Sequence, residues 1–266
     1  MKFIGTTLHF VTRTNEQAGL WTEKIVCDVL GITFQSNRKF FNDYNYPLKL
    51  KDDITALKPK LENICITEHS GNKNLYYDFK TLSGSTVSLK TNTSGHKVCP
   101  QNIGQVSLKK FAEKICNENI KTKLDYKQFV LSNLQSVIDT YLENLFCCEH
   151  ILYIVYDEGM LCHFKKKGQA TIILNNLQLQ TSKNIEDWNE SMSVSIELND
   201  NKYCLCEFQV HNNRDCVKAR FNMKTISMLI ENGLISNVTM DIFNLKHRYN
   251  IKVSKQHYEN ENTIKM

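Results

Sequence analysis

An acid and a lysine flank a short polar turn in the segment from Asp78 to Lys90. The alternation on either side of Ser83-Gly84-Ser85 predicts two antiparallel strands joined by a three-residue loop, a common hairpin type that favours glycine. With Gly84 at its midpoint, Asp78 is expected opposite Lys90, and opposed side chains lie about 5 Å apart. A carboxylate can hold a divalent cation, and a lysine can position the attacking water in phosphodiester hydrolysis. An ordinary ion pair on an exposed hairpin is the competing interpretation.

A second acid precedes this hairpin. Residues 15–30 show the periodicity of an amphipathic helix, and Gly31 is a typical helix stop. Glu23 falls just outside the apolar arc of this helix, at the border between core and solvent. The presence of this border acid before the hairpin favours the functional interpretation of Asp78 and Lys90.

The elements around the hairpin predict a mixed sheet. Ser88 and Lys90 should face one side of their strand, and Val87 and Leu89 the other. Residues 35–75 look irregular. Ser107 is expected to cap a helix, a longer helix is expected over about 126–146, and 151–156 reads as a buried strand. Helices between strands imply crossover connections.

The last third of the chain predicts a two-stranded ribbon. Strands are expected near 202–211 and 217–222, with a turn between them. One face then carries Gln209 and His211 beside polar residues of the partner strand. Such a ribbon fits the DNA major groove, where Gln, Asn and Arg read base edges. A plain solvated sheet face is the alternative. The polar side chains concerned are Gln209, His211, Asn212, Arg214, Lys218, Arg220 and Asn222.

The order of these pieces resembles the PD-(D/E)xK nuclease superfamily, and in particular type II restriction endonucleases. The matching elements are a helix with Glu23, a strand with Asp78, a turn, a strand ending in Lys90, a helix and a strand. The stretch after Lys90, which includes Asn92 and Lys97, and the segment 207–222 also look like the DNA-contacting parts of such enzymes. The resemblance implies that Asp78, Glu23 and the Leu89 carbonyl bind Mg²⁺, and that Lys90 acts on the water.

The sequence departs from the family pattern at Ser88, where an acid is usual. A serine is a poor magnesium ligand beside a carboxylate. Either Ser88 holds a water or a metal-bound oxygen, or Glu23 supplies the missing charge, or a different aspartate is the ligand. The other candidate acids are Asp52, Asp53 and Glu68.

The resemblance implies a mixed α/β fold with a restriction-endonuclease-like core, a central mixed sheet flanked by helices, and a β-rich C-terminal recognition part. We expect one domain over 1–266, with the catalytic core at about 14–160 and the recognition part at about 165–255. The implied function is sequence-specific, Mg²⁺-dependent hydrolysis of double-stranded DNA. We expect a homodimer, because palindromic sites match two-fold symmetry, with a monomer left open. The alternatives are a non-catalytic nucleic-acid-binding protein and a repair or recombination nuclease.

Composition narrows the classes without choosing among these. The 266 residues are 41% apolar, with a net charge of +5 and a pI near 8.6, which is compatible with nucleic-acid binding. Ten cysteines without a Cys-x-x-Cys pair favour free thiols over a zinc site. No apolar run is long enough to span a membrane, so we expect a cytoplasmic protein without membrane contact. The absence of a glycine-rich nucleotide loop and of a nucleophile elbow argues against kinases, dehydrogenases and serine hydrolases.

Overall fold

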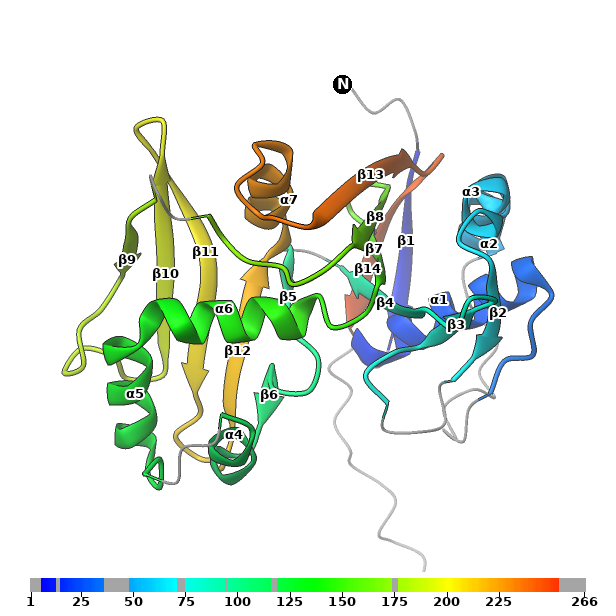
Figure 1. Ribbon diagram of the computed structural model, residues 1–266. Helices are drawn as coiled ribbons and strands as arrows, with labels where there is room; N and C mark the ends of the chain where they lie inside the picture. The colour runs from blue at the N-terminus through cyan, green and yellow to red at the C-terminus, as the bar shows by residue number, and fades with distance from the viewer. Residues whose placement is uncertain are drawn as a thin grey trace, which may run out of the picture.

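Two six-stranded sheets and seven helices make up the described part of the chain (Figure 1). The computed structural model describes residues 6–12, 15–35, 48–70, 75–93, 95–115, 119–173 and 177–253. A separate parallel pair joins β1 (Thr7–Thr12) to β14 (Arg248–Val253), so segments near both ends of the chain lie side by side.

The first sheet is mixed, as expected. Its spatial order is β13 (Val238–Asn244), β8 (Met160–Lys166), β7 (His150–Val155), β4 (Thr86–Asn92), β3 (Phe79–Thr81) and β2 (Ile66–His69). Only β4 and β7 run parallel; the other neighbours in this sheet are antiparallel. One face packs on α1 (Asn15–Leu30), α2 (Leu48–Ala56) and α3 (Lys58–Glu62), where residues such as Ile25, Ile54 and Leu89 share a core.

The register of the β3–β4 hairpin differs from the prediction. Phe79 pairs with Val87, so Asp78 lies opposite Ser88 and not opposite Lys90. The loop is Leu82-Ser83-Gly84, closed by the Thr81 amide donating to the Ser85 carbonyl at 2.9 Å. Gly84 has a φ of +84° and therefore takes the left-handed third position of the loop, where glycine is favoured, and not the midpoint. Because the pairing moves by two residues, Asp78 and Lys90 stay on one face.

The second sheet contains the predicted ribbon. Its order is β5 (Lys97–Val98), β12 (Val217–Asn222), β11 (Asn201–Val210), β10 (Ser191–Leu198) and β9 (Leu179–Thr181), and β6 (Gln105–Val106) also pairs with β12. In Figure 1, α6 (Leu134–Leu145) lies across this sheet, with α4 (Leu108–Lys114) and α5 (Lys123–Ser132) beside it. Val217, Ala219 and Phe221 face this buried side, as expected.

Two helical expectations need correction. The stretch 35–75 is not irregular throughout, because α2, α3 and β2 occupy most of 48–69; residues 36–47 and 71–74 lie outside the described residues. The long helix expected near 126–146 is broken into α5 and α6 at Asn133, whose φ of −127° and ψ of 31° are not helical. Ser107 does cap α4, accepting from the Lys110 amide at 3.3 Å.

The two sheets are interleaved along the chain. The parallel pair β4–β7 requires a crossover, and that crossover carries β5 and β6 of the second sheet together with α4, α5 and α6. The chain then builds the rest of the second sheet and returns to the first sheet with β13. Within the described residues all cysteines are free thiols. No helix among those residues has the length and apolar character needed to cross a bilayer.

Candidate active site and nucleic-acid interface

Glu23, Asp78 and Lys90 lie beside the β3–β4 hairpin of the first sheet, close enough for the charges of Asp78 and Lys90 to act on Glu23. Glu23 projects from α1, Asp78 directly precedes β3, and Lys90 lies on β4. Burial raises the pKa of Glu23, and the negative charge of Asp78 raises it further, while the His69 hydrogen bond and the Lys90 charge lower it. The Glu23 side chain is 13% exposed. A largely buried acid is thus close enough to a second acid and a lysine for their charges to shift its pKa, an arrangement typical of functional sites.

The Asp78 carboxylate is fixed through one oxygen. Its Oδ2 accepts from the Leu89 backbone N–H at 2.6 Å and from the Ser88 hydroxyl at 3.1 Å. Among the described residues, nothing donates a hydrogen bond to its Oδ1. One carboxylate oxygen therefore orients the group, and the other is available for a ligand.

Ser88 belongs to a chain of hydrogen bonds that also contains Gln101. Ser88 is 1% exposed, and its hydroxyl oxygen accepts from the Gln101 side-chain amide at 2.8 Å while donating to Asp78. Gln101 lies in the loop between β5 and β6 and was not among the predicted site residues. No spacing rule relates position 101 to position 88, because the contact depends on how the loop folds back over β4.

The donor set fits a hard divalent cation such as Mg²⁺. Magnesium binds one or two carboxylates and keeps several waters for substrate phosphates. Here Glu23 and Asp78 each have one oxygen without a hydrogen-bond partner among the described residues. The Leu89 carbonyl lies on β4, in the residue whose amide holds Asp78. The cluster has two acids, with the neutral Ser88 beside them, and no group of three or more His, Cys, Asp or Glu suited to a metal occurs in the described residues. The Lys90 amine forms no hydrogen bond or ion pair with any of the described residues.

The other candidate acids lie elsewhere and have other partners. Asp53 is buried and accepts hydrogen bonds from the His247 backbone and ring and from the Tyr249 hydroxyl, which is 2.7 Å away. This network ties α2 to β14. Asp52 is exposed and pairs with Lys49 at 3.6 Å, and Glu68 is an exposed residue of β2. None of these acids joins the Glu23–Asp78 pair.

The polar face of the second sheet is organised around Glu207. Lys97 Nζ lies 2.6 Å and Arg220 Nη2 2.9 Å from its Oε2, and the Gln209 amide donates to its Oε1 at 2.9 Å. Burial acts to raise the pKa of Glu207, but the Lys97 hydrogen bond and the Arg220 charge outweigh burial and lower it. The predicted base-reading residues Gln209 and Arg220 are therefore pre-positioned by an internal acid. Lys218 lies opposite Gln209 on the same face.

The remaining predicted DNA contacts differ in their surroundings. Asn222 caps α7 (Met223–Glu231) by accepting from the Lys224 amide at 3.1 Å. Asn92 donates to the Lys97 carbonyl at 3.3 Å, and the Asn212 carbonyl accepts from the Lys123 amine at 2.8 Å. His211 and Arg214 follow β11 in the turn, where Arg214 is exposed. Asn222 and Asn92 thus have structural bonds that the sequence pattern did not indicate.

Cys99 marks the place where the two groups of residues meet. Burial raises the pKa of its thiol, and the positive charges of Lys218, Arg220 and Lys90 act in the opposite direction. Lys218 and Arg220 belong to the polar face of the second sheet, and Lys90 belongs to β4 of the first sheet. The segment 95–105, which also carries Lys97 and Gln101, therefore connects the candidate catalytic residues to the candidate recognition residues.

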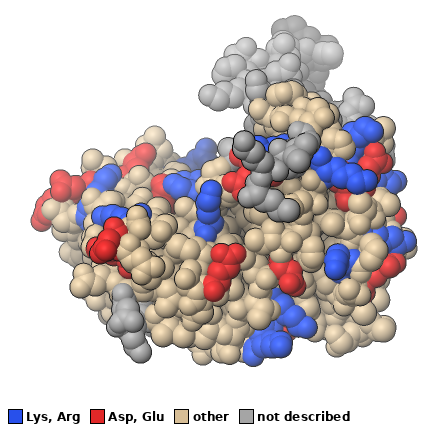
Figure 2. Space-filling model, turned by 90° about the horizontal axis from the view of Figure 1, so that it is seen from above, with Lys and Arg blue, Asp and Glu red and all other residues tan. Residues whose placement is uncertain are grey.

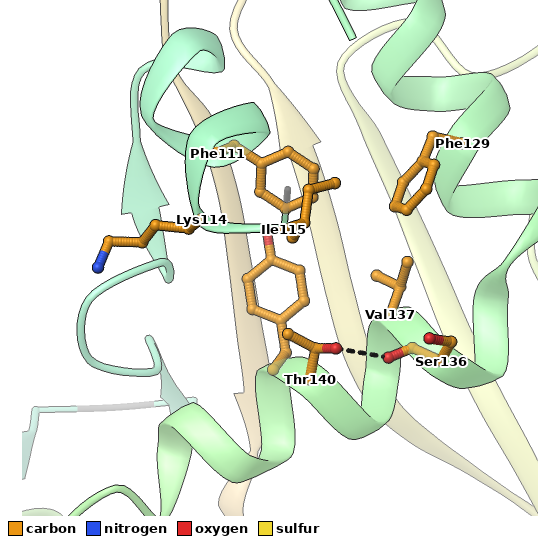
Figure 3. Close-up of a pocket in the computed structure, with 8 residues that line it drawn as sticks. Phe111, Lys114, Ile115, Phe129, Ser136, Val137 and Thr140 are labelled. Carbon is orange, nitrogen blue, oxygen red and sulfur yellow. Dashed lines mark hydrogen bonds between the residues drawn. The ribbon is translucent and has the colours of Figure 1, made fainter. Parts of the chain in front are cut away.

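A pocket of about 290 Å³ lies apart from this region (Figure 3). It is lined by Phe111, Phe129, Val137 and other residues of α4, α5 and α6, and it contains none of the acids discussed above. Thr140 donates to the Ser136 carbonyl at its edge, at 2.8 Å. Its apolar lining does not suit a phosphodiester.

The chain is similar to a type II restriction enzyme. It is 28% identical over 215 residues to the type II restriction enzyme CviAII of Paramecium bursaria Chlorella virus 1, covering 80% of this chain and 60% of that protein. The chain thus spans about three fifths of the length of the curated relative it matches. No family model matches the chain, and no solved structure matches it. The similarity supports the resemblance to restriction endonucleases that the sequence pattern indicated, and the mixed sheet flanked by helices is consistent with it.

Proposed function

We propose that the protein is a Mg²⁺-dependent endonuclease that hydrolyses double-stranded DNA at a specific sequence, as type II restriction endonucleases do. The observation that carries the proposal is the convergence of Glu23, Asp78 and Lys90, with an unbonded oxygen on each acid and an unpaired amine on the lysine, among the described residues. The similarity to a type II restriction enzyme supports the same conclusion.

In this proposal, Asp78, Glu23 and the Leu89 carbonyl hold the cation. When bound, Mg²⁺ would stabilise the negative charge that develops on the phosphate and the leaving oxygen. The Leu89 amide and the Ser88 hydroxyl hold Oδ2 of Asp78, which leaves Oδ1 for the cation. Lys90 orients the attacking water and helps to remove its proton. Ser88 therefore contributes by positioning Asp78, and Glu23 supplies the second negative charge.

Recognition is assigned to the polar face of the second sheet. Gln209, Lys218 and Arg220 would contact base edges or phosphates in the major groove, with His211, Asn212 and Arg214 at the end of the ribbon. Figure 2 shows acidic and basic side chains interspersed over the face of the molecule that is seen from above. We expect a homodimer that matches a palindromic site.

A plasmid digest tests the proposal. The purified chain is incubated with plasmid DNA in Mg²⁺ or in EDTA, and discrete fragments are expected only with Mg²⁺. The Asp78→Asn variant, which keeps the size of the side chain, is the matched control and should leave the plasmid uncut. Retarded but intact plasmid would favour a non-catalytic binder. Nicking or degradation without discrete fragments would favour a repair or recombination nuclease.

A further inference from the structure

The fully buried His69 connects the two acids of the candidate site. It ends β2, its side chain is 0% exposed, and its Nε2 lies 3.2 Å from Oε2 of Glu23. The next amide, that of Ser70, donates to the Asp78 carbonyl at 2.8 Å. We propose that His69 is a positioning residue that sets the orientation of the Glu23 carboxylate for metal binding; this inference rests on the function proposed above.

The hydrogen bonds of His69 define which ring nitrogen carries the proton. The Gln35 backbone N–H lies 3.0 Å from Nδ1, and a backbone N–H can only donate. Nδ1 is therefore the acceptor, and the proton of the ring is on Nε2. Nε2–H then donates to Glu23 Oε2, which leaves Oε1 as the oxygen that can bind a cation. Ligating carboxylates are often oriented in this way by a hydrogen-bond donor behind them.

Packing fixes the ring as well as its proton. The Phe34 ring stacks on the imidazole at 4.7 Å between centroids, and the Phe79 ring contacts it at 5.1 Å. Phe79 directly follows Asp78. The imidazole thus contacts both the residue next to one acid and the carboxylate of the other.

A purely structural histidine would not need the contact with Glu23. The bond from Gln35 already satisfies one ring nitrogen, and an aromatic hydrocarbon would fill the same space between Phe34 and Phe79. Such a replacement would leave Oε2 of Glu23, an acid that is 13% exposed, without a donor. Burying a carboxylate oxygen without a hydrogen bond is costly, so the carboxylate would turn or become protonated.

Two conservative variants separate the contacts of His69. In His69→Gln the side-chain amide nitrogen can take the place of Nε2 and donate to Glu23. In His69→Asn the amide oxygen can take the place of Nδ1 and accept from Gln35, but the side chain is too short to reach Glu23. Calorimetric titration of the DNA-free protein with Mn²⁺ measures the effect on the site directly. We expect about tenfold weaker Mn²⁺ binding in His69→Asn and near-parental binding in His69→Gln.

His247→Gln is the matched control, because His247 also contacts a buried carboxylate, that of Asp53, through Nδ1 at 3.0 Å, but lies outside the site. Its Mn²⁺ affinity should equal that of the parent. The double variant Glu23→Ala/His69→Asn should bind Mn²⁺ as Glu23→Ala does, because His69 acts through Glu23. This comparison stays informative even if His69→Asn is less stable.

Equal Mn²⁺ affinity in His69→Asn and the parent would overturn the role of His69 and leave the nuclease proposal intact. An additive loss in the double variant would do the same. A parent protein that cuts DNA with Mg²⁺ but binds Mn²⁺ independently of Glu23 would also overturn it. A parent that binds no Mn²⁺ at all would overturn both the metal site and the positioning role.

Discussion

Two groups of charged residues in this protein have opposite surroundings. On the polar face of the second sheet, Glu207 is bound to Lys97, Arg220 and Gln209, so its charge is matched within the protein. Beside the β3–β4 hairpin of the first sheet, Glu23 and Asp78 each have one oxygen without a hydrogen-bond partner among the described residues, and Lys90 has no acid partner among those residues. Unmatched charge in a partly buried site is costly unless a ligand completes it. We infer that the first group is held in a fixed arrangement for contact with DNA, and that the second group is completed by a bound cation.

The largest expected effect comes from removing a member of the unmatched group. Lys90→Ala and Asp78→Asn should each lower the rate of Mg²⁺-dependent cleavage by at least about 10³-fold, because the first loses the group that acts on the water and the second loses a metal ligand. Gel-shift binding to the target DNA should stay measurable. Lys166→Ala is a suitable control, since Lys166 lies on β8 and its amine pairs with Glu143 of α6 at 3.3 Å. Full cleavage by either variant would contradict the assignment.

Glu23→Gln should lower the rate of cleavage by about 10²-fold, which is less than the loss expected for Lys90→Ala or Asp78→Asn. At neutral pH the same substitution should make the protein more stable. Burial raises the pKa of Glu23, so the folded protein binds this proton more tightly than the unfolded chain. Stability from this group is present at low pH and is lost as the pH rises through the raised pKa. The melting temperature of the parent should therefore fall relative to that of Glu23→Gln between acidic and neutral pH. If the melting temperatures of the parent and of Glu23→Gln change with pH in the same way, burial does not raise the pKa of Glu23.

Glu207→Gln would break the matched group while keeping its shape. Lys97 and Arg220 would lose their internal acid and become available to phosphates, so we expect about tenfold tighter binding to non-cognate DNA. The plot of the logarithm of the binding constant against the logarithm of salt concentration should become steeper, by the amount expected for about one to two additional phosphate contacts. Cognate binding should gain less, so discrimination falls. Unchanged salt dependence would show that the two cations do not face DNA.

The smallest expected effect concerns Gln101. Gln101→Ala removes the donor to the Ser88 hydroxyl but leaves the Leu89 amide on Asp78, so we expect cleavage to fall only about threefold to tenfold. Single-turnover kinetics at saturating Mg²⁺ would measure this change. A loss as large as that of Asp78→Asn would mean that Gln101 contacts the metal or the substrate itself.

The sequence predicted local elements better than long-range contacts. The helix carrying Glu23 and the face shared by Ser88 and Lys90 follow from periodicities of 3.6 and 2, which depend on neighbours along the chain. The hairpin register was wrong by two residues, because a glycine with positive φ can occupy more than one loop position. The face of the strand was still right, since a shift of two preserves it.

The partners of the site residues could not be predicted from the sequence. His69 meets Glu23 across 46 positions, and Lys97 meets Glu207 across 110. Such contacts depend on how the sheets pack, and no spacing along the chain encodes them. The helix α2 was missed for a different reason. Its apolar side is narrow and contains a buried acid, Asp53, in place of a hydrophobic residue.

The crossover between β4 and β7 has a consequence for how this protein can acquire new specificity. Because that connection contributes strands and helices to the second sheet, and β13 returns to the first, neither sheet is a continuous piece of chain. A fragment containing only β9 to β12 would lack β5 and β6, which belong to the same sheet. Removing that fragment would separate β13, an edge strand of the first sheet, from β8 along the chain. We therefore expect a single unfolding transition. New target sequences should arise by point substitution on the existing surface, since exchange of a detachable reading module is not open to this architecture.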